Sequence, residues 1–402
     1  MKQQSVSDRL KKVPASPFRK FVPLSQAAKK DGVKVYHLNI GDPDIKTPAV
    51  MLEVLTHWER NPISYSLSQG EPSFLTALHG YYRSLGFSFL EENHIQVTTG
   101  GSEAISMALF ATCNPGDEVL VFEPFYANYN SYAVVNGVSF VSVLTELSNG
   151  FHLPDRSTIE KTITSKTKAI MICTPNNPTG TVYTEEEMQM LVSIAKDHGL
   201  FLISDEVYRE FCYDALKQVS LFSFMQEIPK LAIVVDSLSK RYSLCGARLG
   251  CLVSLNPEIM SGVLYIAQGR LSSGLIDQVM ASKLSDVPAS YTEGVRQEYE
   301  TRRNVLFEEL SKIDGIALPP KPEGAFYMIV GLPVADADDF CRYLLTDFRD
   351  KNETVMITPA TGFYATPGRG KNEVRIAYVL NADSIKRSVE ILNKALMSYR
   401  AK

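Results

Sequence analysis

From about residue 95 to residue 254, short apolar runs rich in β-branched residues alternate with longer amphipathic segments. The runs are apolar at successive positions, as strands covered by helices on both faces should be. Their alternation with helical segments predicts repeated βα units and a mainly parallel sheet. The predicted strands are 95–98, 119–123, 138–144, 168–174, 200–205, 231–236 and 249–254.

The clearest covering helix is predicted over residues 184–198, where apolar residues recur along one stripe. Thr184 and Glu187 have capping-box spacing, and Gly199 can end the helix. Outside the repeat, residues 1–44 are punctuated by prolines and are expected to form an irregular arm. From about residue 290 a long charged helix is predicted, and we expect a domain boundary near 285–295.

Composition excludes several classes of protein. The chain has 402 residues, a net charge of −4 and six scattered cysteines. It therefore does not resemble a disulfide scaffold, and a reducing, cytoplasmic setting is expected. A near-balanced charge argues against a nucleic-acid partner. No apolar run approaches the roughly 18 residues of a membrane span, and the basic start at 9–12 lacks the apolar segment of a signal peptide.

Motifs of other enzyme classes are missing. The chain has no HExxH, CxxC pair or GxSxG, and its six histidines are dispersed, so no metal site is expected. The segment 368–372 superficially resembles a phosphate-binding P-loop. Ala365 stands where that motif needs its first glycine, and no Ser or Thr follows Lys371.

Four segments that carry possible chemistry each follow a predicted strand. In open α/β sheets, ligands bind outside the carboxyl ends of the strands. Each segment taken alone also has a structural explanation: a tight turn for the first two, and a helix cap or surface acid for the third. The segments are 99–103 (TGGSE), 174–180 (TPNNPTG), 204–208 (SDEVY) and 237–250 (SLSKRYSLCGARLG).

The fourth segment is the most specific, because it places Lys240 between two apolar strands, with Arg248 eight residues later. Lysine is seldom buried without a task. A desolvated lysine near other cations has a lowered pKa and can form a Schiff base with a carbonyl. The alternative, a solvated loop lysine, is disfavoured by the three preceding segments.

Together, and in order, these segments resemble the class I/II aminotransferases, pyridoxal 5′-phosphate enzymes of fold type I. Further motifs of that family occur at 38–44, 65–70, 322–328 and 374–377. The resemblance implies an α/β fold: a large domain with a mainly parallel seven-stranded sheet, plus a smaller, split α+β domain. The arm at 1–44 would then form part of the small domain, with the large domain at 45–290 and the rest of the small domain at 291–402.

The resemblance also implies roles for individual residues around the cofactor. Lys240 matches the lysine that binds the cofactor and moves the substrate's proton. Asp205 matches the acid that keeps the pyridine nitrogen protonated. The remaining matches are Asn177 and Tyr208 for the phenolic oxygen, Tyr126 rather than Phe125 for stacking, and Gly101, Ser102, Ser237 and Arg248 for the phosphate.

Other matches concern the substrate and a second subunit. Arg375 matches the arginine that binds the substrate α-carboxylate, and Gly41 lies where the family's arm passes over that group. Local sequence alone would make Arg375 an ordinary surface charge in an edge-like strand. Tyr65 matches a residue that reaches the phosphate of the neighbouring subunit, which implies a homodimer with shared active sites.

The reaction implied is exchange of an amino group between an L-amino acid and a 2-oxo acid, with 2-oxoglutarate expected in one half-reaction. The segment 268–274 places Gln268, not Arg270, nearest the position of a second, side-chain-binding arginine, so aspartate specificity is not implied. A C–S lyase or other elimination enzyme on the same fold is the alternative. A cofactor-binding regulator is disfavoured, because the first 44 residues are too short and proline-rich for a DNA-binding domain.

Overall fold

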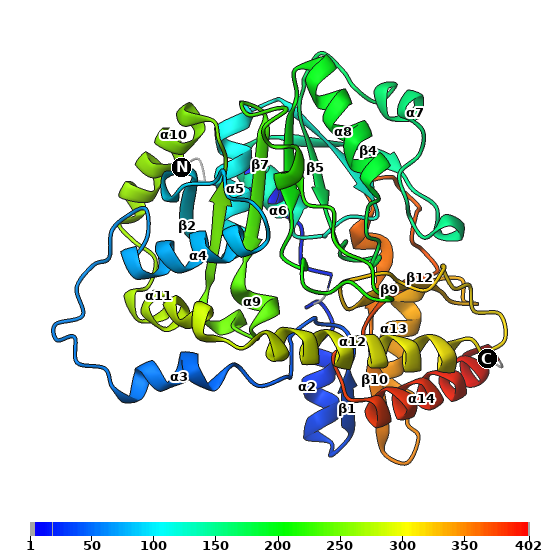
Figure 1. The fold of residues 1–402 in the computed structure, drawn as a ribbon. Coiled ribbons are helices and arrows are strands. Elements are labelled where there is room, and N and C mark those ends of the chain that lie inside the picture. Colours follow the sequence, from blue (N-terminus) through cyan, green and yellow to red (C-terminus); the bar gives the residue numbers. More distant parts are fainter. Residues whose placement is uncertain (1–4, 18, 401–402) are drawn as a thin grey trace.

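The large sheet runs through the centre of the molecule in the computed structural model, which describes residues 5–17 and 19–400. It has seven strands in the order β2-β8-β7-β6-β5-β3-β4 (Figure 1). β8 runs antiparallel to both of its neighbours, and the other pairs are parallel. The strands are β2 (Ile95–Thr99), β3 (Glu118–Glu123), β4 (Ser139–Leu144), β5 (Thr167–Cys173), β6 (Phe201–Asp205), β7 (Ala232–Ser237) and β8 (Leu249–Val253).

All seven predicted strands are therefore confirmed, to within a residue or so at each end, and so is the mainly parallel α/β fold. The predicted helix at 184–198 is also confirmed as α8 (Glu185–His198). Thr184 and Glu187 form both bonds of the capping box, and Gly199 ends the helix in the left-handed conformation.

Helices cover both faces of this sheet. One face packs against α4 (Pro72–Ser84), α8 and α11 (Leu275–Ala281), and the other against α5 (Gly100–Thr112), α6 (Tyr129–Asn136) and α10 (Pro257–Arg270). Because both faces are covered, side chains at successive strand positions are buried: β7 and β8 have no exposed residue. The apolar runs of the sequence follow from this arrangement. Shorter helices are α3 (Ala49–Thr56), α7 (Arg156–Glu160) and α9 (Leu238–Arg241).

A second hydrophobic core joins the two ends of the chain, at the lower right of Figure 1. β1 (Lys34–His37) pairs in parallel with β10 (Glu353–Met356), and β12 (Glu373–Ala377) lies between β11 (Thr358–Pro359) and β9 (Tyr327–Gly331) in an antiparallel sheet. The helices packed there are α2 (Val22–Lys30), α12 (Ala289–Leu310), α13 (Ala337–Thr346) and α14 (Ala382–Arg400).

The expectation of an irregular arm at 1–44 is wrong for much of residues 5–17 and 19–44, and residues 1–4 and 18 lie outside the described part of the chain. α1 (Asp8–Lys12), α2 and β1 are regular elements. Pro23 lies in the first turn of α2, where proline's missing N–H costs nothing, so it starts a helix rather than breaking one. Between them, residues 13–17 and 19–21 are irregular. Over the described part of the chain, no helix combines the length and apolarity needed to cross a membrane.

Candidate active site

A cavity of about 660 Å³ opens where the parallel strands of the large sheet end, between that sheet and the second core. It is lined by residues from several strand ends together with residues from positions 40–42, 327 and 375 of the chain. The predicted site residues on its wall are Gly41, Gly101, Ser102, Tyr126, Asn177, Asp205, Tyr208, Ser237, Lys240, Arg248 and Arg375. Tyr65 is not among the lining residues, and it is 79% exposed.

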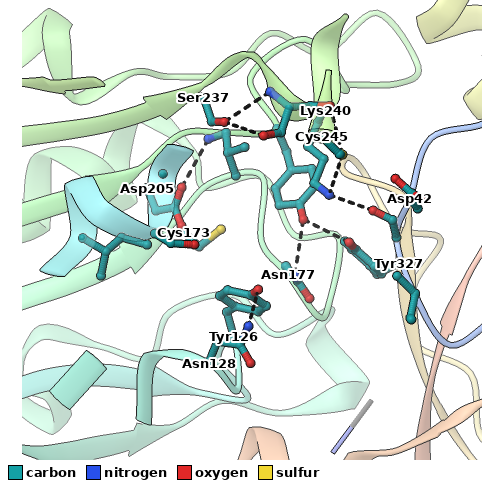
Figure 2. Close-up of a pocket in the computed structure, with 18 of the residues that line it drawn as sticks. Asp42, Tyr126, Asn128, Cys173, Asn177, Asp205, Ser237, Lys240, Cys245 and Tyr327 are labelled. Atoms are coloured by element: carbon teal, nitrogen blue, oxygen red, sulfur yellow. Dashed lines mark hydrogen bonds between the residues drawn. The ribbon is translucent and has the colours of Figure 1, made fainter. Parts of the chain in front are cut away.

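Lys240 is brought to the cavity by the short helix α9, which follows β7 directly. Ser237 ends the strand and caps the helix, because its hydroxyl accepts the N–H of Ser239. The Lys240 Nζ donates to the carbonyl of Gly41 at 2.7 Å and lies 3.6 Å from the Cys245 Sγ (Figure 2). A buried ion pair between Arg241 and Asp236 anchors the residue next to Lys240.

Asp205 is the last residue of β6 and is buried, 5% exposed. Its carboxylate accepts the Tyr129 hydroxyl at 2.7 Å and the Val207 N–H at 3.3 Å. The pKa of Asp205 is raised to about 6, against an ordinary 3.8, mainly by burial. The hydrogen bonds from Tyr129 and Val207 act against this shift, and the nearby carboxylates of Asp236 and Glu206 add to it. An ionised Asp205 in this position is stabilised by a cation on the cavity side.

A chain of hydrogen bonds crosses the cavity wall from the large sheet to the second core. The Asn177 Nδ2 donates to the Tyr208 hydroxyl at 3.3 Å, and that hydroxyl lies 3.0 Å from the Tyr327 hydroxyl. On its other side, Asn177 Oδ1 accepts the Arg375 Nη1 at 3.0 Å. Figure 2 shows Asn177 and Tyr327 next to each other on this wall. Asn177 therefore links both halves of the site.

Arg375 is 2% exposed, and its strand β12 is central in the small antiparallel sheet. The expectation from local sequence of a surface charge in an edge-like strand is therefore wrong, because β11 covers the outer edge of β12. The Arg375 Nη2 donates to the Asn39 carbonyl at 2.6 Å, and the guanidinium lies 4.4 Å from the Tyr327 ring. Burial lowers the pKa of Arg375, so a bound anion would offset the cost of its desolvation.

The other end of the cavity is suited to an anion. Gly101 and Ser102 lie in the first turn of α5, whose first N–H groups have no acceptor within the helix. Arg248 lies beside them: a Cβ on Gly100 would come within 2.6 Å of its Nη2. A Cβ on Gly250 would meet Gly100 C at 2.6 Å, so only glycine lets β8 approach the start of α5 this closely.

The neighbouring aromatic residues Phe125 and Tyr126 lie in different surroundings. Tyr126 lines the cavity and accepts a hydrogen bond from Asn128 Nδ2 at 2.7 Å, whereas Phe125 packs into the core against Phe140. Gly41 also shows why its residue type matters, because a Cβ there would lie 1.8 Å from the Tyr327 hydroxyl. No larger residue fits at position 41 without moving Tyr327.

Sequence reasoning missed several residues of the site. Tyr327 belongs to a motif that was noted at 322–328, but no role was assigned to it. Tyr129 binds Asp205 from a helix that begins in the turn after β3. Asn39, Asn128 and Cys245 also contact site residues. No local signal distinguishes any of these from ordinary core or loop residues.

Arg270 is engaged within its own chain. It donates to Ser273 Oγ at 2.7 Å and to the Val97 carbonyl at 3.1 Å, and it pairs with Glu103 at 3.1 Å. Gln268 is exposed. Neither residue lines the cavity of this chain.

Comparison with known proteins adds independent information. The profile of the family described as "Aminotransferase class I and II" matches residues 33–392. The chain is 30% identical to a probable aspartate/prephenate aminotransferase of Aquifex aeolicus, over 98% of this chain and 99% of that protein. Among solved structures, it resembles the aspartate aminotransferase from Thermus thermophilus with maleate (TM-score 0.87, 26% identity, 98% and 100% of the two chains). An alanine aminotransferase from Pyrococcus furiosus is equally similar, with a TM-score of 0.87, 26% identity and the same coverage.

Proposed function

The chain belongs to the class I and II aminotransferases, and we propose that it exchanges an amino group between an L-amino acid and a 2-oxo acid by a ping-pong mechanism. The protein is a transaminase with pyridoxal 5′-phosphate as its cofactor. For one of the two half-reactions we propose 2-oxoglutarate as the acceptor. The observation that supports the proposal is that Lys240, Asp205 and Arg375 line one cavity.

The chemistry of the donor set fits this cofactor. When bound, the cofactor supplies a pyridine ring that accepts the negative charge developing on the substrate Cα. Asp205 would hold the nitrogen of that ring protonated, and the positive charge would bring the raised pKa of Asp205 down again. Asn177 and Tyr208 offer an amide and a hydroxyl to the phenolic oxygen, and Tyr126 offers an aromatic face.

The phosphate would be held at the α5 end of the cavity. The N–H groups of Gly101 and Ser102 and the hydroxyl of Ser237 supply donors there, and Arg248 supplies charge and can bind two oxygens at once. With this division, the residues proposed for the cofactor's two charged ends would come from different strand ends of one sheet. The cofactor would be fixed before any substrate enters.

Lys240 has two proposed tasks: covalent attachment of the cofactor and proton transfer at the substrate Cα. Its amine lies at the cavity wall, held by the Gly41 carbonyl and close to the Cys245 Sγ. Positioned proton transfer of this kind contributes about 10²- to 10⁴-fold to a rate.

Arg375 would bind the α-carboxylate of the amino acid with its two Nη groups. Asn177 and the Asn39 carbonyl already hold the guanidinium in one plane. The carboxylate would lie beside Gly41, whose lack of a side chain lets the Tyr327 hydroxyl lie close to the strand-connecting backbone there. The amino acid would thus be oriented with its Cα toward Lys240.

The preferred amino acid is not defined by these contacts. Arg270 is occupied by Glu103 and Gln268 is neutral, so the chain shows no arginine committed to a side-chain carboxylate at that segment. We therefore propose an L-amino acid as donor without restricting it to aspartate. The comparison proteins named for aspartate and for alanine are equally similar in structure.

We further propose a homodimer with shared active sites, located in the cytoplasm and serving amino-acid biosynthesis. Tyr65 lies in a segment without regular structure whose side chains Ile63, Tyr65 and Leu67 are all exposed. Exposed apolar clusters of this kind favour a protein interface. Six free cysteines are compatible with a reducing compartment.

The test is a single half-reaction. The holoenzyme is mixed with each common L-amino acid in turn, without a 2-oxo acid, and both the absorption band of the lysine-bound cofactor and the release of 2-oxo acid are followed. We expect one equivalent of 2-oxo acid per site and then no further product, with turnover restored by 2-oxoglutarate.

Two other outcomes decide against the proposal. Continued release of ammonia and 2-oxo acid from an amino acid alone would identify the alternative, a lyase. A Lys240→Ala variant that kept the same cofactor band and the same half-reaction would remove Lys240 from the mechanism. The exposed Lys283→Ala variant is the matched control and is expected to behave as the wild type.

A further inference from the structure

Residues 38–47, here called the strap, connect β1 to the start of α3, and residues 40–42 of the strap line the cavity. The first half of the strap is held by backbone bonds. The Leu38 N–H donates to the Met356 carbonyl at 2.9 Å, and the Ala377 N–H donates to the Leu38 carbonyl at 2.8 Å. In the middle, the Asn39 and Gly41 carbonyls accept from Arg375 and Lys240. Two carbonyls of the strap thus touch the two cationic side chains on which the proposed reaction depends.

The second half of the strap is held by fewer contacts. The Tyr291 hydroxyl donates to the Lys46 carbonyl at 2.9 Å, and the Thr47 hydroxyl donates to the Ser243 carbonyl at 3.0 Å. Beneath it lies an open hollow of about 530 Å³, lined by residues 44–46 and by α12. Ile45 packs, half-buried, against the second core, and polar contacts hold the rest of this half of the strap.

The strongest of these contacts is an ion pair. Arg302 of α12 donates from Nη1 to Asp44 Oδ1 at 2.7 Å, and the Arg302 side chain is only 5% exposed. The same guanidinium donates to the Val379 carbonyl, two residues beyond the strand that carries Arg375. Arg302 also pairs with Glu298, one turn earlier on α12, at 2.8 Å. Arg302 therefore ties the strap both to α12 and to the chain that leads from Arg375.

We propose that the Asp44–Arg302 ion pair is a latch that fixes the strap across the cavity and so positions the Asn39 and Gly41 carbonyls against Arg375 and Lys240. Both residues are positioning residues, because neither lines the cavity itself. This inference rests on the proposed function for its kinetic consequence, but the latch is a property of the chain alone. Without it, the guanidinium of Arg375 loses the fixed position of one partner, the Asn39 carbonyl, and keeps the other, Asn177, so amino-acid binding should weaken. Cofactor binding depends on other segments and should not change.

The chain offers a matched control for this latch. Asp44 and Glu298 are both carboxylates bound to Arg302, and each is nearly half exposed, but only Asp44 belongs to the strap. Asp44→Ala and Glu298→Ala therefore remove the same charge from the same arginine. For Asp44→Ala we expect KM for the amino acid to rise about three- to tenfold, with kcat changed less than about twofold. Glu298→Ala should leave both constants near the wild type, and Asp44→Glu should recover part of the loss.

A second measurement needs no activity. Hydrogen–deuterium exchange of the peptide covering 38–47 is compared in the wild type, Asp44→Ala and Glu298→Ala. Their thermal unfolding midpoints check that all three proteins are folded. We expect faster exchange in Asp44→Ala only. Equal exchange in all three would overturn the latch. If exchange rises in Asp44→Ala but the wild type transaminates no amino acid, the latch stands and the proposed function fails. Unchanged KM with faster exchange would overturn the link to substrate binding.

Discussion

The two sides of the cavity are built in different ways. On the sheet side, Ser102, Asp205 and Lys240 each lie at or just beyond the end of a strand of one hydrogen-bonded sheet. On the opposite side, Gly41, Tyr327 and Arg375 come from segments that are far apart in the chain. The hydrogen bond from Arg375 to the Asn39 carbonyl, for example, spans 336 positions. The sheet side is one continuous scaffold, whereas the opposite side is an assembly of separate pieces.

This difference agrees with the proposed roles of the two sides, cofactor binding on the sheet side and substrate binding on the opposite side. A sheet buried on both faces holds its strand ends rigidly, which suits a cofactor that stays bound. The opposite side depends on side-chain bonds to backbone carbonyls, such as those to Asn39 and Gly41. Such bonds can open and reform, which suits a substrate that must enter and leave at every half-reaction. We expect changes on the sheet side to affect kcat, and changes on the opposite side to affect KM.

The largest predicted effect comes from Asp205 on the sheet side. Asp205→Asn keeps the size of the side chain but cannot hold a ring nitrogen protonated by its charge. We expect kcat to fall about 10²- to 10³-fold with KM changed little, because one preorganised charge in a buried site is lost. Steady-state kinetics with the best amino acid from the half-reaction panel measure this. A large change in KM with little loss of kcat would contradict the division between the two sides.

In the cofactor-free protein, we expect Asp205→Asn to increase the stability of the fold. The folded state keeps the Asp205 proton up to a pH of about 6, because its pKa is raised, whereas the unfolded state releases it near 3.8. Stability is therefore lost as the pH rises from 3.8 to 6 and stays lower above that range. At pH 7, Asp205→Asn should raise the free energy of unfolding by about 1–3 kcal/mol. Urea unfolding should show this gain shrinking as the pH is lowered to 5.

Sequence predicted the sheet side well and the opposite side poorly, and the reason is physical. Strand ends such as Thr99 and Asp205 follow from local apolar runs, and repeated βα units bring those ends to one edge. Tyr327 reaches Tyr208 across 119 positions, and no local pattern encodes that contact. Arg375 and Gly41 were identified through resemblance alone. The local sequence alone predicted that Arg375 lies at the surface. The helix α2 was not predicted, because the prolines before residue 24 were interpreted only as residues that interrupt helices.

The third prediction concerns Arg375 on the opposite side. Arg375→Lys keeps the positive charge but loses the planar fork that could bind two carboxylate oxygens. We expect kcat/KM for the amino acid to fall about 10- to 100-fold, mostly through KM, as one charge-assisted hydrogen bond is lost. The affinity for the cofactor, followed by its absorption band, should remain unchanged. A variant that lost the cofactor would show that Arg375 supports the sheet side as well.

The smallest predicted effect tests how the two sides are joined. His152 Nδ1 lies 3.0 Å from Glu187 of α8, and its Nε2 lies 3.4 Å from Glu323, four residues before Tyr327. Hydrogen bonds to these two carboxylates raise the pKa of His152 to about 10, against 6.5 in the unfolded chain. The stabilisation is therefore complete below pH 6.5 and is lost as the pH rises toward 10.

His152→Gln should lower the free energy of unfolding by about 1–2 kcal/mol at pH 6.5, a value reduced by the partial exposure of all three side chains. The difference from the wild type should disappear near pH 10, with kcat and KM unchanged at pH 7.5. His198→Gln, which removes a more exposed histidine paired with Glu160 alone, should cost less. A loss of stability that does not depend on pH would mean that His152 acts by packing. A change in KM would mean that the position of Tyr327 depends on the ion pair between His152 and Glu323, whose Nε2 and carboxylate oxygen lie 3.4 Å apart.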